Sequence, residues 1–430
     1  MYPNLYYALR DLTGAEFKWL RFVNSFGFFV AMAFLIAAYF LVKELKRKER
    51  AGVLQATDVK ITIGEPASIL ELLTNFLLGF VFGYKFIGLF LADEKLSADP
   101  QQFIFSSEGS WLAGIVLALF FTGLKWWEKN KRKLSKPEVR SIRIWPHDRV
   151  GDIVIYAALF GFLGAKIFHN LENWNEFWAS PVEALLSFSG LTFYGGLICA
   201  TLAIWYYARK HKIGFKHLCD AAAPALMIAY AVGRIGCQVS GDGDWGVLNS
   251  AYATNRESQV VSVDTAQFKT HLELNKTFYY NEFKTNDLST VPHIRVEAPS
   301  WLPVWMVAYT YPHNVLNQGS PINGCEDKEY CNHLPSPVFP TPFYETVMAL
   351  ILFGFLWGIR KKLVIPGTLF AVYLMVNGVE RFLIEKIRVN TTYDQLPFRP
   401  TQAELISLGL VIIGIILFWR FSKNKTAATK

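Results

Sequence analysis

The chain has 430 residues, of which 52% are hydrophobic and 18% are charged, and its formal net charge is +8. Its 13 Trp, 19 Tyr and 35 Phe residues are typical of a polytopic membrane protein with aromatic belts at the two interfaces. Lys and Arg alternate with long apolar runs instead of clustering on one soluble face, which excludes a nucleic-acid-binding protein.

The N-terminal segment LYYALRDLTGAEFKWLRF is amphipathic and precedes the first apolar run, which begins near residue 25. A secretory signal would show a short basic region and a small-residue cleavage site here, so we expect no cleaved signal peptide. Leu5, Tyr6, Leu9 and Leu12 fit a helix that lies in the outer membrane interface or packs against the other helices.

Nine apolar runs have lengths near the ~20 residues with which a helix crosses a bilayer. They lie at 25–43, 69–91, 111–127, 150–168, 187–208, 218–236, 343–359, 366–385 and 404–420. The predicted fold class is therefore an all-α polytopic integral membrane protein with about nine transmembrane helices.

The connections rich in Lys and Arg fall at every second loop. They are 43–50, 125–143, 208–216, 360–362 and the C-terminal tail. The positive-inside rule then puts the N-terminus and the long segment 247–342 outside and the tail inside.

Two pairs of segments resemble each other at a nearly constant offset. In 77–90 and 158–171, Gly83 and Lys85 match Gly164 and Lys166, and in 106–120 and 187–201 Gly114 matches Gly196. Order and membrane orientation also agree, which indicates a duplicated two-helix unit. Coincidence between glycine-rich membrane helices is the alternative.

The predicted topology brings polar groups of four apolar segments to the outer membrane face. They are Tyr194 at the start of an inward helix, Arg234 at the end of an outward one, Tyr344 and Glu345 at another start, and Arg381, Glu385 and Arg388 at another end. Each has a simpler explanation: Tyr194 as a belt residue, Arg381 and Glu385 as a structural ion pair, and Glu345 as an acceptor of backbone amides.

Arg234 opens the stretch GRIGCQVSGDGDWG at 233–246. An arginine at the end of a membrane segment normally meets an anion, and glycines let backbone amides approach that anion closely. Snorkelling to the surface explains many terminal arginines, but it does not explain the glycine-rich continuation.

Cysteine usage indicates one candidate disulfide. Cys325 and Cys331 lie in the external segment and are close enough in sequence to form a small ring in an oxidising compartment, whereas Cys199, Cys219 and Cys237 are expected to stay reduced. The alternating pattern QVVSVDTAQFKTHLEL predicts strands, so we expect a small α/β or β-containing insert.

These stretches resemble the sequence blocks of prolipoprotein diacylglyceryl transferases. GRIGCQVSGDGDWG is similar to the family's GRIGNFxNGExxG signature, and LTFYGG to its block ending in His-Gly-Gly or Tyr-Gly-Gly. FPTPFYE resembles HPxQLYE, VERFLIEKIRVN resembles GxxRFxxExxR, and TQAELISLGLVIIG resembles the last helix. The resemblance covers the N-terminal helix and roughly 150–430.

The resemblance implies five parts of the chain. They are an interfacial segment with the first helix (1–50), an added two-helix unit (60–145), the first part of the catalytic core (146–246), a periplasmic insert (247–335) and the second part of the core (336–430). The family implies the bacterial inner membrane, with the N-terminus and active site on the periplasmic side and the C-terminus in the cytoplasm.

The implied reaction transfers a diacylglyceryl group from phosphatidylglycerol to the lipobox cysteine thiol of a prolipoprotein, forming a thioether and releasing glycerol phosphate. Arg234 and Arg381 would stabilise the phosphate, Tyr194 or Glu345 would assist thiol deprotonation, and Glu385 would act directly or orient Arg381. The other residues expected to bind phosphatidylglycerol are Gly195, Gly196, Gly236, Gly241, Asp242, Gly246, Tyr344 and Arg388. No metal-ligand cluster is visible, and we expect neither metal nor cofactor.

Four positions depart from the family pattern. Tyr194 stands where many members have histidine, and a phenol more naturally donates a hydrogen bond than accepts a proton. Cys237 replaces an asparagine, Asn377 stands at a frequent tyrosine, and Asp242 or Asp244 takes the place of the signature's glutamate. A multi-pass transporter and a non-catalytic lipid-binding protein are the competing functions; transporters, however, commonly place polar groups near mid-membrane on inverted repeats.

Overall fold

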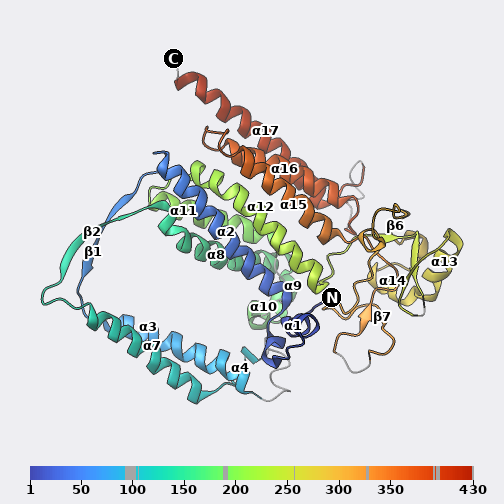
Figure 1. Ribbon diagram of the computed structural model, residues 1–430, viewed down its shortest axis with the longest axis horizontal. Coiled ribbons are helices and arrows are strands. Elements are labelled where there is room, and N and C mark those ends of the chain that lie inside the picture. The colour runs from blue at the N-terminus through green and yellow to red at the C-terminus, as the bar shows by residue number, and fades with distance from the viewer. Residues whose placement is uncertain are drawn as a thin grey trace. The chain divides into compact units, whose positions relative to one another are not determined.

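The computed structural model describes residues 1–92, 103–104, 106–186, 192–255, 257–325, 329–390, 393 and 398–428. Contacts divide the chain into two compact units. Unit 1 comprises Met1–Glu44 and Lys216–Lys430, and unit 2 comprises Leu45–Phe215. Figure 1 shows the helices and strands of both units with their labels.

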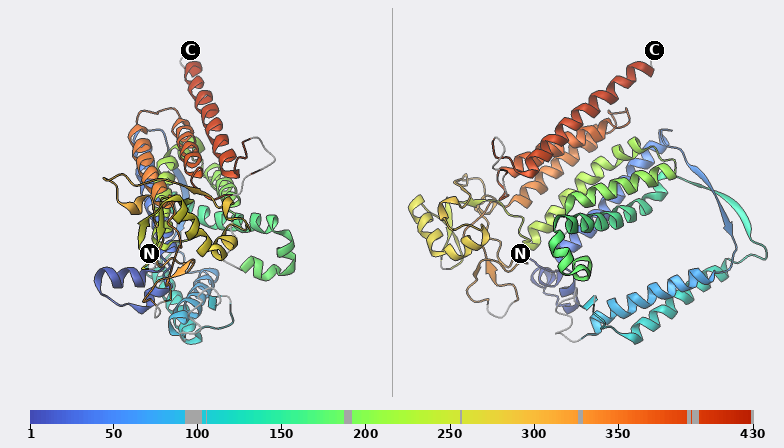
Figure 2. Two further views of the ribbon diagram at one scale, coloured as in Figure 1. Left: turned by 90° about the vertical axis from the view of Figure 1, so that its right-hand side faces the viewer. Right: turned by 180° about the vertical axis from the view of Figure 1, so that it is seen from behind.

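Unit 1 is built around long apolar helices. These helices, with a short N-terminal helix and a 3-10 turn, are α1 (Leu5–Thr13), η1 (Lys18–Phe22), α2 (Ser25–Arg50, which continues into unit 2), α12 (Phe215–Ser240), α15 (Thr341–Ile359), α16 (Thr368–Glu385) and α17 (Gln402–Ala428). Small and large residues interdigitate between α12, α15 and α16, where Ala223, Met227, Ala349, Leu356 and Leu369 are buried together. Figure 2 shows α16 and α17 side by side from behind.

A buried carboxylate fixes the start of α16. Gly367 precedes the helix with φ +94°, a conformation that favours glycine. The Asp220 carboxylate of α12 accepts hydrogen bonds from the backbone nitrogens of Gly367 (2.8 Å) and Phe370 (3.0 Å). Since orphan N–H groups at a helix start need partners, this side chain ties the two helices together.

The insert between α12 and α15 contains short strands and short helices. In chain order they are β3 (Leu248–Asn249), β4 (Tyr252–Thr254), β5 (Val260–Ser262), α13 (Thr265–Leu274), α14 (Lys276–Glu282), η4 (Leu288–Thr290), β6 (His293–Ile294), η5 (Val304–Met306), β7 (Ser320–Pro321) and β8 (Asn332–His333). β3 pairs with β6 in parallel, while β4 pairs with β5 and β7 with β8 in antiparallel fashion. Figures 1 and 2 show these elements beyond one end of α12, α15 and α16.

The strand prediction for QVVSVDTAQFKTHLEL is right for its first part and wrong for its second. Val260–Ser262 forms β5, but Thr265–Leu274 forms the helix α13. Asp264 and Gln267 make a reciprocal capping box at its start. Phe268 and Leu272, four residues apart, are both buried. The cap and this helical spacing outweigh the local alternation.

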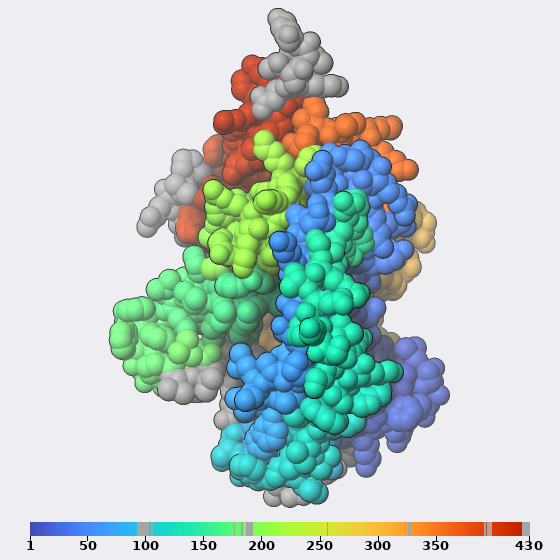
Figure 3. All heavy atoms as spheres, turned by 90° about the vertical axis from the view of Figure 1, so that its left-hand side faces the viewer, coloured from blue at the N-terminus to red at the C-terminus, as the bar shows by residue number. Residues whose placement is uncertain are grey.

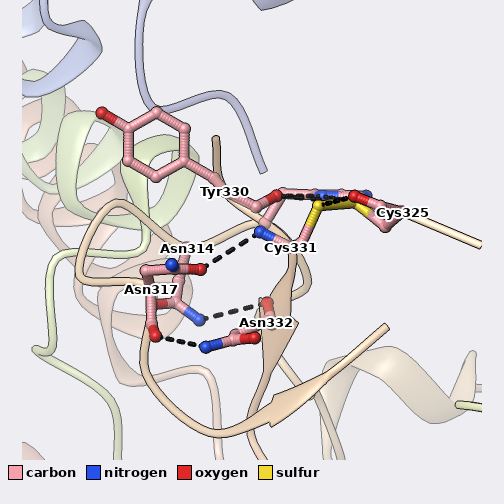
Figure 4. Close-up of a disulfide and its surroundings, with 7 residues drawn as sticks. Asn314, Asn317, Cys325, Tyr330, Cys331 and Asn332 are labelled. Carbon is pink, nitrogen blue, oxygen red and sulfur yellow. Dashed lines mark hydrogen bonds between the residues drawn. A yellow bond between two sulfur atoms is a disulfide. The ribbon is translucent and has the colours of Figure 1, made fainter. Parts of the chain in front are cut away.

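A disulfide joins Cys325 and Cys331, whose Cα atoms are 5.5 Å apart. Figure 4 shows the asparagine side chains around it. Asn317 Oδ1 accepts from the Cys331 backbone nitrogen at 3.1 Å, and Asn314 Nδ2 donates to the Asn332 carbonyl at 3.4 Å. The bond therefore belongs to a hydrogen-bonded turn of the insert.

The N-terminal helix α1 contacts the insert. Asn4 caps it by accepting from Tyr7 N, and Gly14 ends it with φ +74°. Tyr6 is buried, Leu12 is 75% exposed, and the Tyr7 ring lies edge-on to Tyr330 of the insert. Packing against other parts of unit 1 thus accounts for one face of the predicted amphipathic helix.

The described residues of unit 2 form two helix pairs and a two-stranded ribbon. Its elements are β1 (Thr57–Ile63), α3 (Ile69–Val81), the π-helical turn η2 (Phe82–Ile87), α4 (Gly88–Leu91), α7 (Trp111–Lys131), β2 (Glu138–Ile144), η3 (Pro146–Arg149), α8 (Val150–Glu172), α9 (Trp174–Ala179), α10 (Pro181–Leu186) and α11 (Phe193–Lys210). β1 and β2 pair antiparallel over their whole length. α3 packs against α7, as Figure 3 also shows, and α8 packs against α11.

The described residues contain a helix at each of the nine predicted apolar runs, with 187–191 of one run outside them. In the part of the chain that the structure describes, six helices are long and apolar enough to cross a membrane, namely Ser25–Arg50, Ile69–Leu91, Pro146–Glu172, Phe215–Ser240, Thr341–Ile359 and Gln402–Lys423. The helical, polytopic character is confirmed, together with small sheets in the insert.

Candidate functional site

Helix ends in unit 1 carry the charged groups of the candidate site. Arg234 lies near the end of α12, Glu345 in the first turns of α15, and Arg381 near the end of α16, with Arg388 just beyond it. Asp244 follows α12 in the connection to the insert. Of the side chains that the topology predicted to converge, the structure brings together Arg234, Glu345, Arg381 and Arg388.

Glu345 is the centre of this cluster. Its Oε1 atom accepts from Tyr230 OH at 2.9 Å, Arg381 Nη1 at 3.3 Å and Arg388 Nη1 at 3.4 Å. Its Oε2 atom lies 3.2 Å from Arg234 Nε in an ion pair. The side chain is 0% exposed, and a buried carboxylate requires such cationic partners. Its contacts are with side chains of other elements, whereas a helix-capping role would require contacts with backbone amides.

Asp244 joins two of the same arginines from the other side. Its two carboxylate oxygens form ion pairs with Arg234 and Arg388. Burial raises the pKa of Asp244, but the two guanidinium groups lower it by a larger amount. The pKa of Asp244 therefore lies below its ordinary value. Asp244 is therefore a stable anion that bridges the end of α12 to the segment after α16.

Asp242, the aspartate expected to bind phosphatidylglycerol, has different surroundings. Its carboxylate lies beside the Cys237 thiol, and burial raises its pKa. Within the described ranges Asp242 forms no ion pair with an arginine, whereas Asp244 forms two. Of the two candidates for the signature's acidic position, Asp244 is the one that holds the arginines.

Arg381 is held between two carboxylates. Its Nη1 reaches Glu345, and its Nη2 lies 3.1 Å from Glu385 Oε2. Glu385 Oε1 in turn accepts from Asn390 Nδ2 at 2.6 Å and Thr401 Oγ1 at 2.7 Å. Glu385 is thereby fixed in place beside Arg381.

The three arginines differ in exposure. The Arg381 side chain is 27% exposed, compared with 19% for Arg234 and 12% for Arg388. Arg381 is therefore the most exposed cation of the cluster. An incoming anion can reach its guanidinium group more easily than those of the other two.

The predicted phosphate-cradling glycines are explained by close packing. A Cβ atom on Gly236 would lie 2.9 Å from Phe29 Cβ of α2, and one on Gly241, which has φ +66°, 2.9 Å from Asn314 Cβ. At Gly246 it would lie 2.6 Å from the Ile387 carbonyl oxygen. Each contact is too short for a side chain, so these glycines let α12 and its loop approach their neighbours.

Tyr344 binds the insert. Its hydroxyl donates to the Met306 carbonyl, which links α15 to η5. In the described contacts it therefore fastens the insert to the helices and does not take part in the ion-pair cluster.

Tyr194, Gly195 and Gly196 belong to α11 in unit 2. The two glycines allow α11 to lie close to α8: a Cβ on Gly195 would be 2.6 Å from the Gly164 oxygen, and one on Gly196 2.9 Å from the Gly161 oxygen. Their observed contacts are those of a helix pair joined through small residues.

Two residues of the cluster escaped the sequence analysis. Tyr230 lies one helical turn before Arg234 and donates to both Glu345 and, at 3.4 Å, Glu380 Oε1. Glu380 is 2% exposed. A carboxylate within an apolar run is a signal on its own, because burying it there is costly.

Three side chains offer closely spaced metal-ligand atoms. Those of Cys237, Asp242 and Asp244 lie within 4.8 Å of one another. Both oxygens of Asp244 are engaged by arginines, which compete with a metal cation for the same carboxylate. The arrangement therefore suits an arginine cluster that receives an anion better than a cation site.

The comparisons with known proteins agree with the sequence motifs. A family model described as prolipoprotein diacylglyceryl transferase matches residues 109–420. The match begins within the segment 60–145, so it includes α7 and β2, which the motif comparison had assigned to an addition.

Relatives named phosphatidylglycerol–prolipoprotein diacylglyceryl transferase come from several bacteria. One from Dehalococcoides mccartyi is 25% identical over 77% of this chain and 98% of its own length. One from Corynebacterium efficiens is 25% identical over 74% of this chain and 77% of its own length. One from Neisseria gonorrhoeae is 22% identical over 74% and 91%, respectively. Because the family model covers well over half of the chain, the chain belongs to the prolipoprotein diacylglyceryl transferase family.

Proposed function

We propose that this protein transfers the diacylglyceryl group of phosphatidylglycerol to the lipobox cysteine of a prolipoprotein. The sulfur–carbon bond of a thioether forms, the bond between the glyceryl carbon and the phosphate oxygen breaks, and glycerol phosphate leaves. The observation that carries the proposal is the cluster of Arg234, Arg381 and Arg388 around buried Glu345, built from helix ends that contain the family's sequence blocks.

The cluster suits the leaving group. Negative charge develops on the departing phosphate, and preorganised guanidinium groups stabilise that charge without reorganising during the reaction. Arg381, the most exposed of the three, makes the first contact with the phosphate, while Asp244 and Glu345 hold Arg234 and Arg388 in position. A phosphate that enters the cluster binds arginines that already form ion pairs with Asp244 and Glu345.

The surroundings of Glu345 favour a positioning role over that of thiol base. Its carboxylate is fully buried and contacts three guanidinium groups. Because this side chain has no exposed surface, an incoming thiol has no direct access to its carboxylate. Tyr194 remains the candidate to assist the thiol, as a hydrogen-bond donor to a reacting group, together with Gly195 and Gly196 of its sequence block.

The apolar helices and the family indicate a multi-pass inner-membrane protein. We further propose nine spans, with the N-terminus, the insert and the charged cluster on the periplasmic side and the C-terminus in the cytoplasm. Basic segments at every second connection support this orientation.

The two helix pairs of unit 2 are proposed to be copies of one ancestral pair. Ser110 N donates to the Tyr84 carbonyl at 3.0 Å, and Thr192 N donates to the Ala165 carbonyl at 3.1 Å. The residues of the first bond and those of the second are separated by the same nearly constant offset as the similar sequence segments. Glycines at matching positions, Gly83 and Gly164, make the close helix contacts.

One assay tests the proposal against a transporter or a non-catalytic lipid-binding protein. The purified protein is incubated with labelled phosphatidylglycerol and a lipobox peptide that carries Cys or, as the control, Ser at the acceptor position. The expected result is label on the Cys peptide alone and stoichiometric release of glycerol phosphate. A protein that binds the lipid but leaves the Cys peptide unlabelled would contradict the enzymatic function.

A further inference from the structure

A cavity of about 210 Å³ lies next to the arginine cluster, within unit 1. The loop Gly243–Gly246 forms one wall and Arg388 and Val389 another. A third wall consists of Phe278, Tyr279 and Glu282 of α14 and of Phe283, which follows the helix. The remaining lining residues of the insert are Leu248, Leu334, Pro335, Ser336 and Val338. The cavity therefore lies between the segment after α16 that carries Arg388 and helix α14 of the insert.

The position of the cavity follows from that of the helices. The described residues that line it belong to the insert, to the loop after α12 and to the segment that follows α16. Figures 1 and 2 show the insert beyond the ends of the apolar helices. The cavity thus begins where the apolar helices end.

A phosphodiester held by the arginines has two substituents. The diacylglyceryl substituent must extend along the apolar helices, because its acyl chains belong in the bilayer. The second substituent then points away from the helices, toward the insert. Arg388 connects the two regions, since it pairs with Glu345 and Asp244 in the cluster and also lines the cavity.

The lining suits a small polyol. Glu282 contributes a carboxylate, and Ser336 contributes a hydroxyl whose oxygen accepts from Tyr279 OH at 2.6 Å. Trp245, Phe278 and Phe283 supply apolar surface for carbon–hydrogen groups. Since one water occupies ~30 Å³ in the liquid, the cavity has room for a three-carbon polyol and accompanying waters.

We propose that this cavity binds the glycerol that is esterified to the phosphate, with Glu282 as a hydrogen-bond acceptor for its hydroxyls. The proposal rests on the proposed function and adds a specificity site formed by the insert. The same glycerol phosphate chemistry occurs in the donor headgroup and in the released product. The insert would thereby select phosphatidylglycerol among anionic phospholipids.

The first experiment compares two donors in the Cys-peptide assay. Phosphatidylglycerol carries the distal glycerol, whereas phosphatidylmethanol offers the same phosphodiester with a methyl group in its place. The wild-type protein is expected to prefer phosphatidylglycerol in kcat/KM. Glu282→Gln should reduce this preference on the order of 10-fold, the effect of one hydrogen bond to a charged group. The loss should appear in KM for phosphatidylglycerol, with turnover of phosphatidylmethanol unchanged.

The control is Glu273→Gln, which changes an exposed glutamate of α13 that does not line the cavity. Phe283→Trp serves as a second cavity variant, because it narrows the space without changing charge. It should also impair phosphatidylglycerol more than phosphatidylmethanol. Elution as a monodisperse species in size-exclusion chromatography verifies that each variant is folded.

A second arm separates the donor headgroup from the released product. Glycerol phosphate and inorganic phosphate are compared as inhibitors of the wild-type protein and of Glu282→Gln. Stronger inhibition by glycerol phosphate that the variant loses supports product binding, even when donor preference does not change. Equal donor preference and equal inhibition in both proteins overturn the inference while leaving the transferase function intact. Failure of the wild-type protein to modify the Cys peptide with either donor overturns the proposed function, and the inference with it.

Discussion

Arg234 Nε of α12 lies 3.2 Å from Glu345 Oε2 of α15, and the glutamate is entirely buried. This contact joins two of the family's sequence blocks. Because Glu345 also contacts Arg381 and Arg388, one carboxylate sets the positions of three cations.

Replacing the central carboxylate should disrupt the cluster. In Glu345→Gln three guanidinium groups lose their common anion, and breaking a buried ion pair from one side costs about 3–5 kcal/mol. We expect a lower melting temperature in detergent and a loss of transfer of at least about 100-fold. Glu71→Gln, which changes a partly exposed glutamate paired with Lys129, should leave both quantities nearly unchanged. Wild-type turnover in Glu345→Gln would show that the negative charge is dispensable.

Arg381 should not tolerate lysine. Its guanidinium group reaches Glu345 and Glu385 with different nitrogens, and a lysine ammonium cannot reproduce this planar fork. We expect Arg381→Lys to lower kcat/KM on the order of 10-fold or more, with Arg381→Ala lower still. Arg295→Lys, at an exposed pair with Glu297 in the insert, is the matched control. Similar kcat/KM values for Arg381→Lys and the wild-type protein would exclude a bidentate role.

Asp244 should make stability depend on pH in a defined direction. Its pKa lies below the ordinary value because Arg234 and Arg388 outweigh the effect of burial. The stabilisation is therefore present above the unfolded-state pKa of about 3.9 and is lost as the pH falls through the lower folded-state pKa. The wild-type melting temperature should exceed that of Asp244→Asn by a constant amount between about pH 5 and 8, and the gap should shrink below about pH 4. A gap that widens on acidification would contradict this sign.

The disulfide is expected to stabilise the insert without taking part in the reaction. The closed loop is short, and loop-entropy arguments give about 2 kcal/mol for a ring of this size. Replacing Cys325 and Cys331 together with Ser should accelerate proteolysis of the insert and leave transfer to the Cys peptide within about twofold of wild type. Cys199→Ser is the control for loss of a thiol. Abolished transfer in a protein with an intact insert would point to a catalytic role.

The α3–α7 hairpin offers a test of the duplicated unit. Leu134 N donates to the Gly64 carbonyl at 3.2 Å, so the ends of the hairpin already meet. Replacing 65–133 by a short glycine-containing turn should preserve the β1–β2 ribbon and retain transfer activity if this copy is accessory. Loss of activity in a folded, membrane-inserted variant would indicate that α7, which the family model covers, contributes to the reaction.

The sequence by itself determined where the long helices lie, because a run of about 20 apolar residues has few alternatives to a buried or membrane-spanning helix. It also predicted a converging set at helix ends from chain order and loop charge. Arg234, Glu345, Arg381, Glu385 and Arg388 of that set lie together, whereas Tyr344 contacts the insert and Tyr194 belongs to unit 2. The cysteine pair of the insert was visible as a short, external spacing.

Tertiary structure alone decided the contacts within that set. The participation of Tyr230 and Glu380 depends on which faces of α12 and α16 meet, and a single polar residue in an apolar run does not reveal its partner. The choice of Asp244 over Asp242 depends on a loop with left-handed residues at Gly241 and Gly243, which sets the direction of each side chain. The packing roles of Gly236 and Gly246 likewise arise from neighbours distant in sequence. The local sequence pattern determines where a helix lies and which charged residues it carries. Only the packing between helices and loops determines which of these charged residues contact each other.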